Sequence, residues 1–145
     1  MTGHAFQFLV DDDELCASLA AIRRALIDGG RFAFETRNQV ARAWESWNPA
    51  NAIEIVDPAG QQVHVSYEVE SVVEDLVTVT EITSDERGVP LRVDRATLRF
   101  LDIGTLARFL ATAGFQIETQ CGGWSREPLD AASAEIITVA GVSRK

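Results

Sequence analysis

Hydrophobic residues recur at helical spacing in two separate stretches of this 145-residue chain. Apolar residues at steps of three and four line one face of a helix, so these stretches predict helices over residues 13–28 and 102–113. Aspartates precede both patterns and glycines follow them, as helix caps and stop signals do. The two stripes consist of Leu15, Leu19, Ile22 and Leu26, and of Leu106, Phe109, Leu110 and Ala113.

Short stretches of alternating apolar and polar residues lie between the two expected helices. Turn sequences separate them, so they predict an antiparallel meander with one buried and one exposed face. In the last stretch the apolar positions change phase between Val93 and Leu98, which indicates a bulge or a strand that passes between two environments. The stretches are 53–56, 63–69, 76–82 and 91–100.

Three further strands are expected outside the meander. Residues 31–36 (RFAFET) are apolar without clean alternation, as in a strand covered on both faces, and this implies a doubly wound sheet. Residues 116–121 and 135–142 predict two strands that run antiparallel to each other, because a short loop joins them. The sequence therefore predicts an α/β fold in which these strands form a mixed sheet with both helices packed on it.

The composition indicates a single globular domain, because 46% of the residues are hydrophobic. A formal net charge of −9 and the lack of a basic run argue against a nucleic acid partner. No run of about 18 apolar residues and no signal peptide occur, so we expect a cytoplasmic protein with no membrane partner. Cys16 and Cys121 fit neither a disulfide framework nor a metal site, and we expect buried thiols and no bound metal.

Five segments that cover most of the chain outside the meander carry a family resemblance: TGHAFQ at 2–7, GGRFAFETRN at 29–38, TLRFLDIGTLARFLATAGF at 97–115, GGW at 122–124 and AEIITVAG at 134–141. Together they resemble the C-terminal half of class I S-adenosylmethionine-dependent methyltransferases of the small-molecule type. The resemblance implies a partial Rossmann-like methyltransferase sheet, made of the last strands, with an inserted antiparallel β-meander.

The resemblance also divides the chain. Within a single domain, 1–145, it implies a methyltransferase-like α/β half formed by 1–52 and 101–145. Residues 53–100 form an antiparallel insert or lid.

The cofactor of this family lies against the first half of the sheet, where a glycine-rich turn and an acidic strand end hold it. In this chain the glycine pair at 29–30 ends a helix and the pair at 122–123 lies in a late loop, so neither suits such a turn. The resemblance thus implies that the first three strands of the family are missing. We expect S-adenosylmethionine to serve the complete family enzyme and none to bind to this chain alone.

His4 is the candidate catalytic residue. Methyl transfer to an amine or hydroxyl needs alignment of the reactants and a base, and imidazole exchanges protons near neutral pH. His4 follows the expected fourth strand of the family at the carboxyl edge of the sheet, where open α/β folds bind ligands. Gly3–His4 resembles a Gly-His pair that contacts the acceptor in sugar N-methyltransferases of this superfamily. The alternative is a surface histidine near the end of the chain.

Five other residues are candidates for contact with the methyl acceptor. Glu35, Arg37 and Asn38 follow the strand at 31–36 at the same edge, although they could equally cap the next turn. Trp44 and Trp47 fall at helical spacing before Pro49 and could form an apolar lid or contact the meander, and core packing is favoured over stacking on an acceptor.

Two functions remain open from the sequence. In the first, the chain is the acceptor-binding half of a small-molecule methyltransferase, inactive without a cofactor half. In the second, it is a non-catalytic dimerisation or binding module derived from a methyltransferase. We expect a homodimer, because the strand at 31–36 would leave an apolar edge unpaired without its usual neighbours. The dimer would bury either this edge or the meander against a second copy.

Overall fold

The computed structural model describes residues 1–142, and the chain divides into two compact units. The first unit combines residues 1–42 with the chain from Arg99 onward, and the second is Ala43–Leu98. The division expected from the sequence, after residues 52 and 100, stays a prediction.

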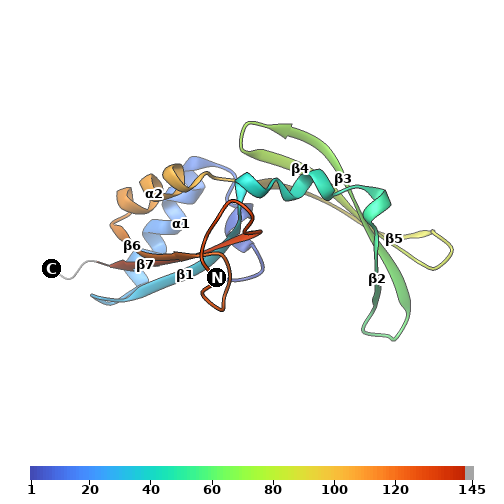
Figure 1. Cartoon of the computed structure of the whole chain (residues 1–145), viewed down its shortest axis with the longest axis horizontal. Coiled ribbons are helices and arrows are strands. Elements are labelled where there is room, and N and C mark those ends of the chain that lie inside the picture. Colours follow the sequence, from blue (N-terminus) through green and yellow to red (C-terminus); the bar gives the residue numbers. More distant parts are fainter. Residues whose placement is uncertain (143–145) are drawn as a thin grey trace. The chain divides into compact units, whose positions relative to one another are not determined.

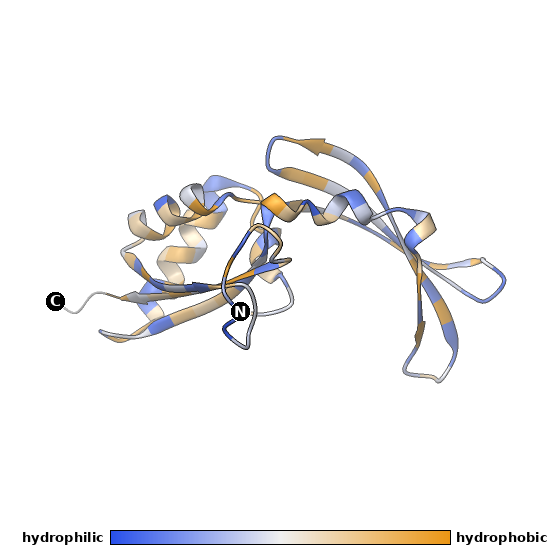
Figure 2. Cartoon of the chain, in the orientation of Figure 1, coloured by the Kyte–Doolittle hydropathy of each residue, from blue (hydrophilic) through white to orange (hydrophobic). Residues whose placement is uncertain are grey.

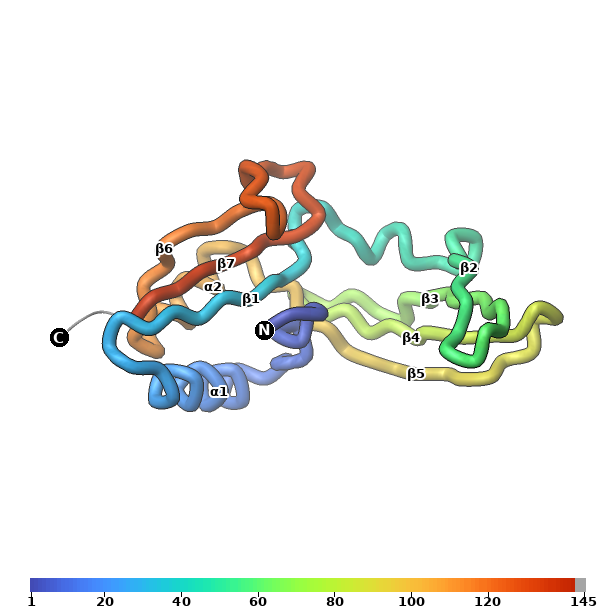
Figure 3. Tube along the Cα trace, turned by 90° about the horizontal axis from the view of Figure 1, so that it is seen from below, coloured from blue at the N-terminus to red at the C-terminus, as the bar shows by residue number. Residues whose placement is uncertain are grey.

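The first unit contains a three-stranded sheet made of β1 (Arg31–Arg37), β6 (Phe115–Cys121) and β7 (Glu135–Val142). The strand order is β1-β7-β6, and β7 is antiparallel to both of its neighbours (Figures 1 and 3). The antiparallel arrangement of the last two strands is therefore confirmed. The prediction of a mixed sheet is wrong, because every strand pair described in this sheet is antiparallel.

Both predicted helices of this unit are present. Helix α1 (Asp12–Ala25) begins at the N-cap Asp11, whose carboxylate accepts hydrogen bonds from the backbone N–H groups of Asp13 and Glu14. Helix α2 (Ile103–Thr112) begins at the N-cap Asp102. These local signals were readable from the sequence because a short polar side chain at the N-cap satisfies N–H groups that the helix itself leaves free.

A single hydrophobic core lies between the sheet and both helices. Phe34 of β1 is fully buried, and register places Thr138 beside it and Ala140 beside Phe32, so these side chains share one face. Leu15 and Leu19 of α1 and Leu106 and Leu110 of α2 fill the same core. Figure 1 shows both helices on this side of the sheet.

The prediction of a doubly wound sheet is wrong for the residues described. Glu35 and Ile137 lie on the face opposite the helices and are nevertheless buried. The β6–β7 loop accounts for part of this burial, since its Trp124 is hydrogen-bonded to Glu35. A buried strand face thus does not require a helix to cover it.

The second unit is the predicted antiparallel meander, with strand order β2-β3-β4-β5. Its strands are β2 (Ile53–Val56), β3 (Gln62–Val73), β4 (Leu76–Ser84) and β5 (Pro90–Arg99), and β5 ends in the first unit. Figure 2 shows hydrophobic and hydrophilic residues alternating along β3 and β4. The apolar phase change in β5 separates the exposed Leu91 and Val93 from the buried Leu98.

The chain between β1 and β2 forms short 3-10 helices: η2 (Gln39–Ala41), η3 (Ala43–Ser46) and η4 (Pro49–Asn51). A further one, η1 (Ala5–Phe8), precedes α1. Trp44 lies in η3, but Trp47 lies just beyond it, so the helical spacing of the two tryptophans does not mark one continuous helix.

Both cysteines are free, but the prediction that they are buried is wrong. Cys16 is exposed on α1, off the stripe that faces the core, and Cys121 is half-buried at the end of β6.

No helix within residues 1–142 is long and apolar enough to cross a membrane.

Candidate functional site

The Gly3–His4 turn is held in an unusual backbone conformation. Both residues have positive φ, 67° at Gly3 and 56° at His4, a region that glycine enters readily and most other residues avoid. Successive N–H groups in such a turn point toward one spot and form a cradle for an anion. Here the anion is the Glu35 carboxylate, which accepts hydrogen bonds from the backbone N–H groups of Gly3 and His4, the latter at 3.1 Å.

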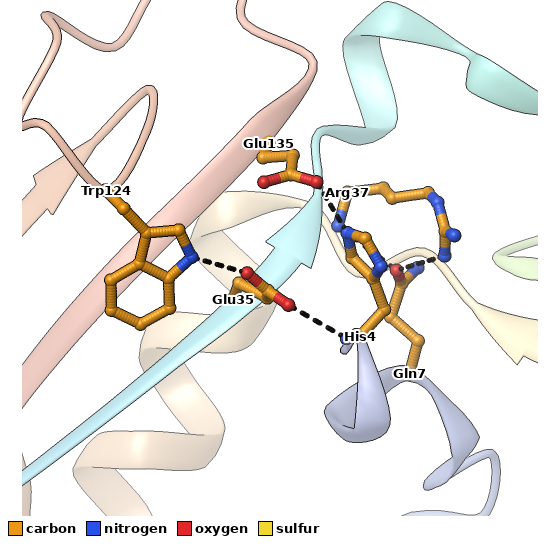
Figure 4. Close-up of polar contacts among 6 residues, drawn as sticks. All are labelled: His4, Gln7, Glu35, Arg37, Trp124 and Glu135. Carbon is orange, nitrogen blue, oxygen red and sulfur yellow. Dashed lines mark hydrogen bonds and ion pairs between the residues drawn. The ribbon is translucent and has the colours of Figure 1, made fainter. Parts of the chain in front are cut away.

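Glu35 connects this turn to the β6–β7 loop. Its second carboxylate oxygen accepts a hydrogen bond of 2.6 Å from the indole Nε1 of Trp124, so Glu35 lies between Trp124 and His4 (Figure 4). Burial raises the pKa of Glu35, but the hydrogen bonds from Trp124, His4 and Gly3 outweigh it, and the pKa lies below its usual value of 4.5. This carboxylate is therefore ionised at neutral pH.

The imidazole of His4 pairs with a second carboxylate. Its Nε2 lies 2.7 Å from Oε1 of Glu135, and both side chains are partly exposed, at 21% and 34%. When Nε2 carries the proton that Glu135 accepts, Nδ1 is left as the basic nitrogen. Within residues 1–142, Nδ1 has no hydrogen-bond partner. The arrangement can orient an imidazole and accept a proton from a bound ligand.

Glu135 is the residue that sequence reasoning missed. It is the first residue of β7, and the register of the sheet places it opposite Arg37 of β1. It lies 131 positions from His4 along the chain, so no local spacing connects the two. The one sequence signal is a glutamate at the start of an otherwise apolar strand.

Arg37 lies at the same edge but is bound to Gln7. The Gln7 side-chain oxygen accepts hydrogen bonds from both the backbone N–H and the guanidinium of Arg37, each at 3.1 Å. The Gln7 amide in turn donates to the carbonyl of Arg99 at 3.0 Å. Because Gln7 is fully buried, these contacts tie the start of the chain to the end of β1.

Asn38 fits the local capping alternative. Its amide nitrogen donates to the carbonyl oxygens of Asp130 and Ser133, and its side-chain oxygen accepts from the N–H of Val40. The side chain is buried, so it fixes the β6–β7 loop against the turn that follows β1.

Trp44 and Trp47 belong to the second unit. The ring of Trp47 lies 6.1 Å from the ring of Tyr67 on β3, and both tryptophans are half-buried. Contact with the meander was one of the two alternatives that the sequence offered, and Trp47 makes it. A part for these two residues in acceptor binding stays a prediction.

Gly30, Gly122 and Gly123 serve close packing in their own turns and loops. Gly30 ends the α1–β1 turn, where an added Cβ would lie 2.8 Å from the Ile27 carbonyl. A Cβ on Gly122 would meet Ser133, and one on Gly123 would meet Glu127, so these positions serve close packing within their own loop. We assign no residue of this chain to the cofactor. Within residues 1–142, no group of three or more His, Cys, Asp or Glu side chains is placed to hold a metal ion.

No protein-family model and no curated protein matches this sequence. Solved structures do match. An S-adenosylmethionine-dependent methyltransferase from Clostridium acetobutylicum matches with a TM-score of 0.75 and 13% identity, over 98% of this chain and 56% of that chain. The CcbJ methyltransferase from Streptomyces caelestis matches with a TM-score of 0.74 and 17% identity, over 98% and 55%.

A third similar structure is that of CalS10, an amino pentose methyltransferase from Micromonospora echinaspora involved in calicheamicin biosynthesis, with S-adenosylmethionine bound. It matches with a TM-score of 0.66 and 18% identity, over 98% of this chain and 57% of that chain. The chain thus has an S-adenosylmethionine-dependent methyltransferase fold but spans little more than half the length of these proteins, which is consistent with a C-terminal half.

We predict that Glu35→Gln destabilises the protein in a pH-dependent way. Folding lowers the pKa of Glu35 below its unfolded value of 4.5. The carboxylate therefore adds to the free energy of unfolding at pH values above 4.5, and this contribution is lost as the pH falls through the lower pKa of the folded state. At pH 7 the variant should have a smaller free energy of unfolding than the wild type, and the difference should shrink below pH 4.5. Chemical denaturation over pH 3 to 7 measures it, with the exposed Glu127→Gln as the matched control. A constant difference at all pH values would contradict the prediction.

Proposed function

We propose that this chain is the acceptor-binding part of a small-molecule methyltransferase that uses S-adenosylmethionine, and that His4 takes a proton from an amine acceptor. The observation that carries the proposal is the pairing of the His4 ring with Glu135 beside the ionised Glu35, on a chain with a methyltransferase fold. In the complete enzyme S-adenosylmethionine supplies the methyl group. The cofactor half is absent from this chain under this proposal, and the chain alone is inactive.

An amine is the acceptor that this site suits. An ammonium group has no lone pair to receive a methyl group until it loses a proton, so a base beside it is useful. Glu35 and Glu135 place two carboxylates around His4, and negative charge attracts a cationic amine more than a neutral hydroxyl. The amino pentose acceptor of the similar CalS10 has the same chemistry.

The remaining candidates have supporting roles in this proposal. Glu35 holds the Gly3–His4 turn and attracts the ammonium, while Arg37 and Asn38 fix the surrounding backbone. Trp44 and Trp47 stay candidates for contact with the acceptor.

The exposed strands of the meander favour association as a second function. Both edge strands carry apolar side chains that are about half exposed or more: Ile53, Ile55 and Val56 on β2, and Leu91 and Val93 on β5. An apolar edge strand is a template for pairing with another chain. We therefore propose that a second copy of this chain pairs with the β2 edge.

We predict that His4→Ala lowers turnover by about 10²-fold or more, the usual scale for loss of a general base. The measurement uses the chain completed by a cofactor-binding half. His64→Ala, which removes the histidine that pairs with Glu54 in the meander, is the matched control and should leave turnover unchanged. Unchanged turnover of His4→Ala across pH 6 to 9 would remove His4 from the mechanism.

We predict that the isolated chain shows no saturable binding of S-adenosylmethionine in calorimetry at millimolar ligand, because we assign none of its described residues to the cofactor. Saturable binding would contradict this prediction, because the chain would then contain a cofactor site of its own. The proposal that a missing half binds the cofactor would be wrong.

We predict that light scattering shows a dimer and that Ile55→Lys converts it to a monomer, because a charge in the middle of β2 opposes pairing between edges. Gln61→Lys, in the turn after β2, adds the same charge outside the strand and should leave the dimer intact. A monodisperse wild-type monomer would refute the proposed association.

A further inference from the structure

Trp124 is an exposed aromatic side chain whose position is fixed. Its exposed fraction is 51%, although its indole N–H donates to the buried carboxylate of Glu35 at 2.6 Å (Figure 4). Large exposed side chains usually sample several rotamers, but this charge-assisted hydrogen bond holds the plane of the ring. The half-exposed indole therefore offers a flat apolar surface on which a planar ligand can stack.

A cavity of about 450 Å³ lies beside this indole, on the sheet face of the first unit that is opposite the helices (Figure 1). Ile137 and Val139 of β7 form its apolar floor. They alternate with the buried Thr138 and Ala140, which point toward the helices, so the two pairs lie on opposite faces of the strand. Small-molecule sites commonly have this size and an apolar floor of this kind.

An ion pair lies at one end of this cavity. The guanidinium Nε of Arg31 is 2.6 Å from Oε2 of Glu118, and both residues line the cavity. Register places Arg31 beside Gly141, two residues beyond Val139, and a Cβ on Gly141 would collide with the Glu118 carboxylate. The glycine thus leaves room for the pair, whose two charges offset each other.

Arg126 gives the cavity its net charge. It lies in the loop between β6 and β7, where its backbone N–H donates to the Gly123 carbonyl at 3.0 Å. Within residues 1–142, no acidic side chain pairs with its guanidinium. Two arginines against one glutamate leave the lining with a charge of +1, in a chain whose formal net charge is −9. A cationic site on an acidic protein favours an anionic ligand.

We propose that this cavity binds a planar aromatic carboxylate, with the ring stacked on Trp124 and the carboxylate paired with Arg126. The ring covers the apolar floor, and a guanidinium can hold both oxygens of a carboxylate. The ionised Glu35 at the indole N–H repels the carboxylate of the ligand and so directs it away from that edge of the indole. The single unpaired guanidinium suits one negative charge better than a phosphate, because Glu118 repels any further charge.

This site is distinct from the one proposed for the methyl acceptor. His4, Glu35 and Glu135 do not belong to the lining of the cavity, and Glu35 contacts Trp124 through the indole N–H. The inference therefore goes beyond the proposed function and does not depend on His4 as a base.

The experiment is an NMR titration of the chain with cinnamate, with cinnamamide and cyclohexanepropionate as comparison ligands. Cinnamamide keeps the flat ring without the charge, and cyclohexanepropionate keeps the charge without the flat ring. The chain has three tryptophans, so their indole N–H signals can be assigned with single variants. We expect cinnamate to shift the signal of Trp124 saturably and to leave Trp44 and Trp47 unchanged. Each comparison ligand should bind about tenfold more weakly.

Variants separate the charge from the cavity itself. Arg126→Asn removes the guanidinium at a residue with a positive φ of 64°, a conformation that asparagine tolerates. It should weaken cinnamate binding about tenfold and leave cinnamamide binding unchanged. Arg42→Asn makes the same change at an arginine that also has positive φ but lies outside the cavity, and should alter neither. Val139→Phe fills the floor, keeps the Trp124 signal as the reporter and should weaken both ligands.

Each part of the proposal has an outcome that would overturn it. Equal affinity for cinnamate and cinnamamide would overturn the anionic character of the ligand, and equal affinity for cinnamate and cyclohexanepropionate would overturn stacking on the indole. Cinnamate binding that neither Arg126→Asn nor Val139→Phe weakens would mean that the ligand binds outside this cavity. The absence of a saturable shift at Trp124 with all three ligands would overturn the site altogether.

Discussion

The carboxylate of Glu35 receives hydrogen bonds from two parts of the chain that are distant in sequence. The backbone N–H groups of Gly3 and His4 bind it from the first turn of the protein, and the indole of Trp124 binds it from the loop between β6 and β7. Burying a charged group costs free energy unless hydrogen-bond donors surround it. The folded structure therefore keeps each of these donors within hydrogen-bond distance of the carboxylate. The positions of the Gly3–His4 turn and of the exposed indole of Trp124 both follow from this one constraint.

The order of the strands decides what lies beside Glu35. Because β7 is inserted between β1 and β6 and is antiparallel to both, its first residue is brought to the edge of the sheet where β1 ends. Glu135 thereby meets the imidazole of His4, and the two carboxylates flank a histidine whose backbone is already fixed. An imidazole oriented by a carboxylate is a common arrangement for proton transfer, and the proposed role of His4 uses it.

The two faces of this sheet have different roles. Phe34, Leu19 and Leu110 fill the face toward the helices, and their burial supplies much of the stability of the first unit. The other face is closed only in part, by the loop that carries Trp124, and Ile137 and Val139 form the floor of a cavity there. The core therefore lies on one face of the sheet, and the opposite face is left partly open.

The sequence by itself determined the local elements of this protein. Periodicity of three and four residues placed α1 and α2, alternation placed the strands of the meander, and Asp11 and Asp102 marked the helix starts, because these signals act between residues close in the chain. The sequence also placed His4, Glu35 and Arg37 at one edge from their position after strands, and contacts at the end of β1 do involve all three, while their part in acceptor binding stays a prediction. Only the tertiary structure decided that both helices lie on one face, and that Glu135 and Trp124 complete the site. Pairing between distant strands and a loop depends on the register and order of the whole sheet, and no short-range pattern encodes that order.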